Sequence, residues 1–212
     1  MIPYPKIPSV FKRDEQTHKF IPGEWSSPEI EYLATSDWVA TEKVDGTNIR
    51  VVWEPDTPVR FAGRTNNSSV PTFLLERLGT LFPPEKFNSF DAMCLYGEGH
   101  GARIQRGGAN YKADGTDFVL FDVRALGSQD VWWWLGRDNV EDIATQLGIG
   151  VVPIRRIDSL WNLLDIVQEG FTSNWGDFPA EGLVLRPQVD LCTRAGHRII
   201  TKAKHKDFPT EA

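Results

Sequence analysis

A lysine stands between two acids, just before a glycine turn, in the stretch 41–48 with the sequence TEKVDGTN. Residues that favour strands flank this stretch, because β-branched and aromatic side chains dominate 38–40 and 49–53. Asp-Gly between two such runs is typical of a tight turn. We therefore expect Lys43 at a strand end, with its amine directed into the cavity that the turn borders.

Lys43 allows two interpretations, a solvated surface lysine or a nucleophile. An amine is protonated and inert near neutral pH unless desolvation or a nearby cation lowers its pKa. The flanking acids act in the opposite direction. A nucleophilic Lys43 therefore requires a metal ion or other lysines close by.

Later segments contain residues of the required kinds. Lys202 and Lys204 are two apart in a predicted strand over 198–204, so both side chains point to the same face. Glu181 precedes the apolar run 183–185, and an acid at the start of a buried strand is costly unless it is paired or metal-bound. The simpler interpretation of Lys202 and Lys204 is a solvated lysine pair on an exposed strand face. The simpler interpretation of Glu181 is a salt bridge at a strand end.

The order and character of these segments resemble the covalent nucleotidyltransferase superfamily, which comprises polynucleotide ligases and mRNA capping enzymes. Within it, the sequence is most similar to the ATP-dependent RNA ligases of the RNA ligase 2-like branch. The resemblance runs from about Trp38 to Lys204. Besides 41–48, the matching segments are residues 61–65, 95–99, 118–123, 181–186 and 199–204.

The resemblance implies a reaction in three steps. Lys43 attacks the α-phosphorus of ATP to give lysyl-AMP, the AMP passes to the 5′-phosphate of a polynucleotide, and a 3′-hydroxyl displaces it. Lys202 and Lys204 would contact the α-phosphate. Glu181 would organise a hydrated Mg²⁺, or Mn²⁺, near it. Such in-line displacements need positioning and charge neutralisation more than covalent help.

The resemblance also implies which residues bind the nucleotide. Glu98 would accept hydrogen bonds from a ribose hydroxyl; the alternative is an ordinary acid in a turn. Phe121 would stack on the base; the alternative is that its ring packs in the core. Glu42 would accept from the adenine amino group, which favours ATP over GTP. Arg64 would lie near the ribose or the 5′-phosphate, and Asn48 would position water or the lysine.

Three alternatives to an RNA ligase stay open. Asp45 stands where this branch often carries histidine, and Asp-Gly also occurs in DNA ligases, so an ATP-dependent DNA ligase is one of them. A capping-type guanylyltransferase and a non-catalytic nucleic-acid-binding module are the others. The loop after Glu98 also resembles the RNA ligase branch, and its Arg103, Arg106 and Tyr111 are candidates for contacts with the substrate.

The elements that must position these residues indicate an α+β fold, with antiparallel sheets flanked by helices. The resemblance implies that this fold is a nucleotidyltransferase (ATP-grasp-like ligase adenylation) domain. The 99–115 stretch reads as a loop, and 1–37 as an irregular Pro-rich leader with a short helix or turn near 27–33. Asp138 is the expected cap of one helix. Strands are expected over 38–53, 59–65, 92–98, 117–124, 180–187 and 198–204, and helices over 72–81, 138–147 and 159–169.

Length and composition fit one adenylyltransferase domain spanning 1–212. Relatives usually add a C-terminal domain, whereas this sequence ends soon after Lys204. We therefore expect no appended domain. A partner protein is one possible source of additional contacts with the nucleic acid. The two cysteines form no disulfide framework, and no segment has the length of a signal peptide or membrane span, so we expect a cytoplasmic protein with no membrane contact.

The net charge of −6 argues mildly against nucleic-acid binding, because phosphate contacts need local positive charge. Basic residues are nevertheless concentrated at 194–206 and 103–112. We expect these clusters to contact phosphates of an RNA, as a nicked duplex or an RNA/DNA hybrid.

Overall fold

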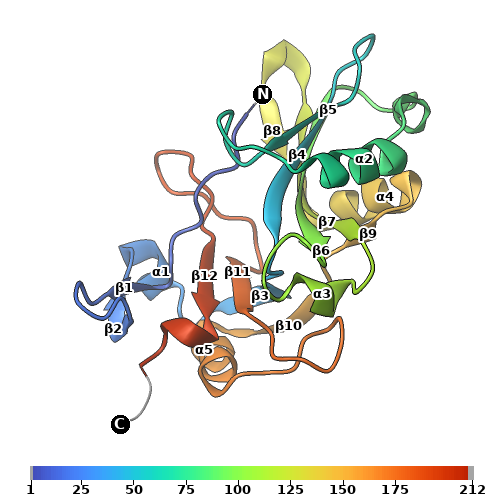
Figure 1. Cartoon of the computed structure of the whole chain (residues 1–212). Helices are drawn as coiled ribbons and strands as arrows, with labels where there is room; N and C mark the ends of the chain where they lie inside the picture. Colours follow the sequence, from blue (N-terminus) through green and yellow to red (C-terminus); the bar gives the residue numbers. More distant parts are fainter. Residues whose placement is uncertain (1, 210–212) are drawn as a thin grey trace. The chain divides into compact units, whose positions relative to one another are not determined.

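The computed structural model describes residues 2–209 and has the expected α+β architecture, with antiparallel sheets and helices (Figure 1). The chain divides into two compact units. Unit 1 contains residues 2–5 and 45–152, and unit 2 contains 6–44 and 153–209. The predicted nucleophile and the Asp-Gly turn after it therefore lie on opposite sides of a unit boundary.

Unit 1 is built on an antiparallel sheet with the strand order β5-β4-β6-β7-β8. A short strand, β9 (Gly150–Val151), pairs with β7 in parallel. The other strands are β4 (Thr47–Trp53), β5 (Arg60–Gly63), β6 (Met93–Gly101), β7 (Thr116–Leu126) and β8 (Trp132–Trp134).

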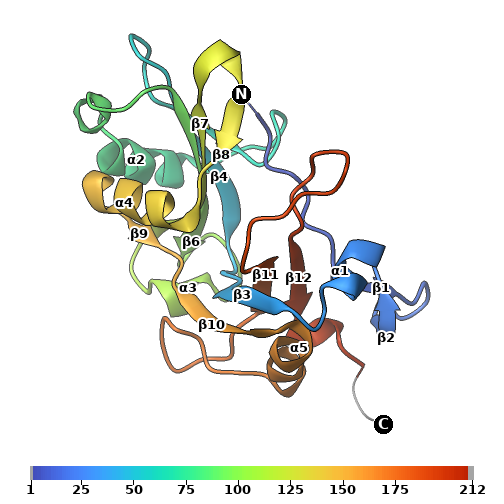
Figure 2. The ribbon, with the colours of Figure 1, turned by 180° about the vertical axis from the view of Figure 1, so that it is seen from behind.

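Helices α2 (Thr72–Leu81) and α4 (Arg137–Leu147) cover the same face of this sheet (Figures 1 and 2). Leu74 and Leu78 of α2 and Leu147 of α4 belong to one buried cluster with the strand side chains. Burying this apolar surface is the main contribution to the stability of the unit. The remaining helices are η1 (Pro84–Phe87), α3 (Gly108–Tyr111) and η2 (Ser128–Asp130).

Unit 2 contains a four-stranded sheet with the order β10-β3-β11-β12 and a separate hairpin, β1-β2. Helix α5 packs on one face of the larger sheet, where Leu160 and Val167 join Trp38 and Leu183 in a buried cluster. The elements are β1 (Phe11–Arg13), β2 (Phe20–Trp25), α1 (Pro28–Tyr32), β3 (Asp37–Glu42), β10 (Ile154–Ser159), α5 (Leu160–Glu169), β11 (Gly182–Pro187), β12 (Thr201–Lys204) and η3 (His205–Asp207).

Two predicted helices are confirmed in detail. Helix α2 has the expected bounds, 72–81. Helix α5 begins after Ser159, whose hydroxyl accepts from the amide of Asn162, as expected of an N-cap. A third helix, α4, ends at Gly148 in the left-handed conformation, but its N-cap is Gly136 and not Asp138.

Three expectations about the path of the chain were wrong. The leader is not irregular throughout, because the strands β1 and β2 pair within it. The short helix expected near 27–33 is confirmed as α1, which begins after the capping Ser27 with Pro28 in its first turn. The 99–115 stretch is not wholly a loop, since β6 extends to Gly101 and α3 forms at 108–111. Strand β10 was missed because its two isoleucines flank two arginines and do not alternate with polar residues.

None of the helices within residues 2–209 is long and apolar enough to cross a membrane. The expectation of a single domain spanning 1–212 concerns autonomous folding, which a division into compact units does not test, and it stays a prediction.

Asp117, near the start of β7, connects that strand to two cationic side chains. Arg77 of α2 donates to both carboxylate oxygens, and Lys112 Nζ lies 3.3 Å from Oδ2. Partial burial raises the pKa of Asp117, but the amide of Phe118, Arg77 and Lys112 more than offset this effect and hold the pKa below its usual range.

We expect Asp117→Asn to remove part of the acid sensitivity of the free energy of unfolding. A carboxyl whose pKa is lowered by folding stabilises the protein above its unfolded pKa of about 3.9, and this contribution disappears as pH falls through the folded value. Because the partners are partly exposed, the loss at neutral pH should be about 1 kcal/mol. Urea titrations should show a smaller difference between variant and wild type at about pH 3 than at about pH 7; an equal difference would contradict this assignment.

Candidate active site

Three strands of unit 2 bring the predicted nucleophile and the lysine pair onto one face of a sheet. In the register of β11 with β12, Gly182 is opposite Lys204 and Val184 is opposite Lys202. The amide of Lys43, immediately after β3, donates to the carbonyl of Gly182 at 2.9 Å. The row Lys43–Gly182–Lys204 therefore crosses the sheet, with Lys202 two rows away and on the same face.

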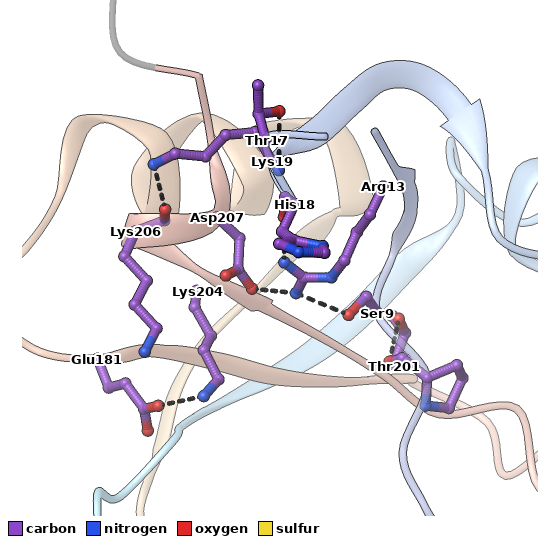
Figure 3. A network of polar contacts seen from close by, with 11 residues as sticks. Ser9, Arg13, Thr17, His18, Lys19, Glu181, Thr201, Lys204, Lys206 and Asp207 are labelled. Carbon is purple, nitrogen blue, oxygen red and sulfur yellow. Dashed lines mark hydrogen bonds and ion pairs between the residues drawn. The ribbon is translucent and has the colours of Figure 1, made fainter. Parts of the chain in front are cut away.

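Glu181 lies between two of these lysines. Lys43 Nζ is 2.6 Å from Oε2 of Glu181, and Lys204 Nζ is 2.5 Å from Oε1. Figure 3 shows the second of these contacts. The three side chains are 15–22% exposed, so the ion pairs are partly shielded from solvent. We expected cations directly beside Lys43; the structure instead places a carboxylate there and Lys204 on its far side.

Gly182 makes this arrangement possible. It lies in the row between Lys43 and Lys204, and a Cβ at this position would be 2.1 Å from the carbonyl oxygen of Ala203. Its φ of 154° is also one that other residues rarely adopt. Glycine therefore lets β11 and β12 approach closely, directly after Glu181.

The charges around Glu181 favour its ionised form. Burial raises the pKa of this carboxyl, but the contacts with Lys43 and Lys204 more than offset the effect, so the pKa lies below its usual range. Glu181 is therefore a carboxylate at neutral pH, as a ligand of a hard cation must be.

The leader holds β12 in place, which the sequence did not reveal. The amide of Val10 donates to the carbonyl of Lys202, and the amide of Lys202 donates to the carbonyl of Pro8. Ser9 forms a parallel bridge with Lys202. The segment 8–10 thus pairs with β12 along its edge and fixes the backbone that carries the lysine pair.

A second set of polar contacts fixes the chain just after β12 (Figure 3). Arg13 donates to both Ser9 and the buried carboxylate of Asp207, and Lys19 donates to the carbonyl of Lys206. These contacts attach η3 to the β1-β2 hairpin, so both ends of β12 are anchored to the leader.

Two of the predicted nucleotide-binding residues pair in the sheet of unit 1. Asn48 of β4 is opposite Glu98 of β6, which in turn is opposite Val119 of β7. The side-chain oxygen of Asn48 is buried and accepts no hydrogen bond from any described residue. A buried polar atom of this kind indicates a place for a ligand or an ordered water.

Phe121 lies two residues after Val119 on β7, and another aromatic ring packs against it. Strand β7 has an irregularity opposite Tyr96 and Gly97, and Phe121 occupies it. The ring of Tyr4 packs edge-on against Phe121, 5.1 Å between centroids, and the Tyr4 hydroxyl donates to the buried carboxylate of Asp122. The half-buried Phe121 ring thus has a fixed orientation.

The remaining predicted contacts lie on loops of unit 1. Exposed Arg64 directly follows β5. Arg103 stacks over the ring of Phe73, Arg106 is exposed, and the Tyr111 hydroxyl accepts from the amide of Asp45. The structure therefore brings together Lys43, Glu181 and the lysine pair in unit 2, and Asn48 and Glu98 in unit 1. Glu42 is in unit 2, and its carboxylate bonds to Ser173 and Asn174.

No cluster of three or more metal-binding side chains occurs among residues 2–209. Glu181 is a single carboxylate with two hard oxygen donors. This donor set fits Mg²⁺ or Mn²⁺, which bind through one or two carboxylates and keep several water or phosphate ligands.

Comparisons with known proteins bear on the fold and on the family of the chain. The solved structures most like this chain include Naegleria gruberi RNA ligase with pyrophosphate, with a TM-score of 0.65, 20% identity, and coverage of 96% of this chain and 62% of that one. A mutant of that ligase with ATP and Mn has a TM-score of 0.64 and 21% identity, with coverage of 96% of this chain and 58% of that one. Another mutant, with AMP and Mn, has a TM-score of 0.64 and 22% identity, with coverage of 85% of this chain and 55% of that one. This chain thus spans 55–62% of the length of these structures.

The structural likeness, at these identities, shows a shared fold. No curated protein matches the sequence. The model of the family described as RNA ligase matches residues 36–204, which is most of the chain and includes Lys43, Glu181 and the lysine pair. The chain therefore belongs to the RNA ligase family.

Proposed function

We propose that this protein is an ATP-dependent RNA ligase that joins 3′-hydroxyl and 5′-phosphate ends through a lysyl-AMP. One observation carries the proposal: the amine of Lys43 is held within 2.6 Å of Glu181, and Lys204 contacts the other oxygen of the same carboxylate. A nucleophilic amine, an acid and a second cation thus meet at one place in a member of the RNA ligase family.

In the first step Lys43 Nζ attacks the α-phosphorus of ATP. The ammonium first loses one proton to solvent, which frees the lone pair; the phosphorus–nitrogen bond then forms, the bond to the pyrophosphate oxygen breaks, and the nitrogen loses a second proton to solvent. Lys204 and Lys202 share a face with Lys43, so they can neutralise the charge that develops on the α-phosphate oxygens.

Glu181 would hold Mg²⁺ or Mn²⁺ through its carboxylate oxygens. The bound ion would supply neutralisation of phosphate charge without a proton transfer. The Naegleria structures that contain ATP or AMP together with Mn support a divalent cation for this fold.

The second and third steps reuse the same groups. An oxygen of the 5′-phosphate attacks the phosphorus of lysyl-AMP and frees Lys43, leaving an adenylylated strand. The 3′-hydroxyl then attacks the 5′-phosphorus, and AMP leaves. Both are in-line displacements, for which the lysines and Glu181 position and neutralise the phosphates.

For the nucleotide we propose that Glu98 binds the ribose, that Phe121 stacks on the base, and that Asn48 and Arg64 contact the ligand. The buried oxygen of Asn48, to which no residue in the described part of the chain donates, and the fixed ring of Phe121 support these roles. Arg103, Arg106 and Tyr111 are the proposed contacts with RNA. We place the protein in the cytoplasm, because Cys94 and Cys192 are both free thiols.

The family match favours RNA ligation over the DNA ligase and capping alternatives. Nicked duplexes with a labelled 5′-phosphate test this directly, in the presence of ATP or GTP and Mg²⁺ or Mn²⁺. We expect sealing with ATP and a 3′-terminal ribonucleotide at the nick, and an adenylylated strand as intermediate. Sealing of all-DNA nicks at an equal rate would instead assign a DNA ligase, and no sealing of any nick would remove the proposal.

A further inference from the structure

Two consecutive residues at the end of β12 hold Glu181. Lys204 Nζ lies 2.5 Å from Oε1 of Glu181, and the amide of His205 donates to the carbonyl of Glu181 at 3.1 Å. The first contact orients the carboxylate, and the second fixes the backbone that carries it. The position of the proposed metal-binding acid therefore depends on the junction between β12 and η3.

Helix η3 is a single turn, too short to be stable by itself, so contacts with other segments set its position. At its first residue, a ring nitrogen of His205 lies 3.1 Å from the carbonyl oxygen of Val167 in α5. At its last residue, Asp207 is only 7% exposed. A buried carboxylate is costly unless a cation or hydrogen-bond donors compensate it, so η3 requires a partner for Asp207.

Arg13 of β1 is a partner of this kind, 194 positions earlier in the sequence. Its Nη2 lies 2.5 Å from Oδ2 of Asp207 and donates to the hydroxyl of Ser9 at 3.1 Å, while Nη1 donates to the carbonyl of His18 at 2.8 Å. Figure 3 shows the guanidinium between Ser9 and Asp207. Because a guanidinium presents its donors in a rigid fork, this one side chain fixes η3 against the leader in a single geometry.

The ion pair of Arg13 with Asp207 lies outside the region that the family model matches. That region, 36–204, includes Glu181 and Lys204 but neither member of the ion pair. The β1-β2 hairpin and η3 therefore support the proposed active site through residues that the family match does not include.

We propose that Arg13 is a positioning residue for Glu181. By compensating the charge of Asp207, it fixes η3. Helix η3 in turn holds Lys204 and His205 against Glu181. In this role Arg13 contacts neither the nucleotide nor a metal ion and acts only through the junction of β12 and η3. The inference rests on the proposed function.

The rate and the cation dependence of lysyl-AMP formation test this role. Removing an outer partner of a metal-binding group typically costs about 10- to 100-fold, and Arg13 acts through η3, so we expect the lower end of that range. Arg13→Gln and Asp207→Asn should each slow adenylylation about 10-fold at saturating ATP and raise the half-saturating concentration of Mg²⁺ by about the same factor. The half-saturating concentration of ATP should change less than about twofold, because the proposed nucleotide-binding residues of unit 1 are untouched.

Three further variants define the ion pair and its control. Because Arg13 and Asp207 act as one pair, the double variant Arg13→Gln/Asp207→Asn should be within about threefold of the slower single variant. Arg13→Lys keeps the charge but lacks the fork of donors, so its rate should lie between those of wild type and Arg13→Gln. Lys12→Gln is the matched control, since it removes a positive charge from the same strand, where Lys12 forms an exposed ion pair with Glu24 at 3.6 Å. Its rate and its Mg²⁺ dependence should equal those of wild type.

Thermal unfolding separates positioning from a general effect on stability, and all rates are compared at a temperature where every variant is folded. If Arg13→Gln and Asp207→Asn lower the melting temperature but keep the wild-type rate and Mg²⁺ dependence, the ion pair only stabilises the fold and the proposal is overturned. It is also overturned if the two losses multiply in the double variant. Asp207→Asn removes the buried charge with little change of shape, so it decides the question even if Arg13→Gln does not fold.

Hydrogen exchange tests the junction without any activity. In Arg13→Gln and Asp207→Asn the amide of His205, which donates to Glu181, should exchange faster than in wild type, while the amides of β4 in unit 1 should not change. Unchanged exchange at His205 would overturn the proposal. If wild type itself takes up no nucleotide, the proposed function fails, and the exchange result still decides whether Arg13 holds the junction.

Discussion

Replacing Lys43 by arginine should abolish lysyl-AMP formation and lower the rate of RNA sealing with ATP at least about 10⁴-fold, as expected for loss of a nucleophile. A guanidinium stays protonated and cannot attack phosphorus, but it can still form an ion pair with a carboxylate. The variant side chain would therefore preserve the contact with Glu181 that Lys43 makes at 2.6 Å. Release of pyrophosphate from labelled ATP measures the first step, and sealing of a nicked RNA measures the whole reaction.

A strand that already carries the 5′-adenylate provides the control for Lys43→Arg. Sealing of this strand does not use the amine as a nucleophile, so the variant should still join it when ATP is omitted. Failure on both substrates would mean that Lys43 is needed for folding or for RNA binding. Pyrophosphate release by the arginine variant at the wild-type rate would contradict the nucleophile assignment.

Glu181→Gln should slow adenylylation about 10²- to 10³-fold, the usual cost of removing one electrostatic group from an active site. Glutamine has nearly the same shape but no charge, so Lys43 and Lys204 both lose their partner. The carboxylate that would bind the divalent cation is lost as well. We therefore also expect half-maximal rate to require a higher concentration of Mg²⁺ or Mn²⁺.

Glu169→Gln is the matched control, because it removes one exposed carboxylate from the end of α5 in the same unit. Its adenylylation rate and its dependence on divalent cation should equal those of wild type. If Glu181→Gln instead shows the wild-type rate and the wild-type cation dependence, Glu181 has only a structural role as the partner of two lysines.

Local sequence patterns predicted the elements whose stabilising contacts are local or periodic. Helices α2 and α5 were correctly placed because their apolar residues recur at helical spacing. Strand β10 was not predicted. It lies at the edge of the described sheet, next to β3, and its arginine and isoleucine side chains include exposed ones, so its sequence lacks the alternation of a half-buried strand. The ordered leader was missed for a related reason, because its pairing partner, β12, lies far along the chain.

The same distinction holds for the candidate site. Alternation along a strand was enough to predict that Lys202 and Lys204 lie on one face. The register of β11 with β12 confirms this placement. The bond between Glu42 and Ser173 joins residues 131 positions apart, and the bond from Tyr4 to Asp122 spans 118. No local pattern encodes such contacts, so these supporting residues came only from the tertiary structure.

Mass spectrometry of the wild-type protein after incubation with ATP and Mg²⁺ tests the central claim most directly. The account predicts a single added AMP that acid removes, located by peptide mapping at Lys43 and absent from Lys202 and Lys204. An adduct at another residue, or a protein that takes up no AMP while remaining folded, would contradict it.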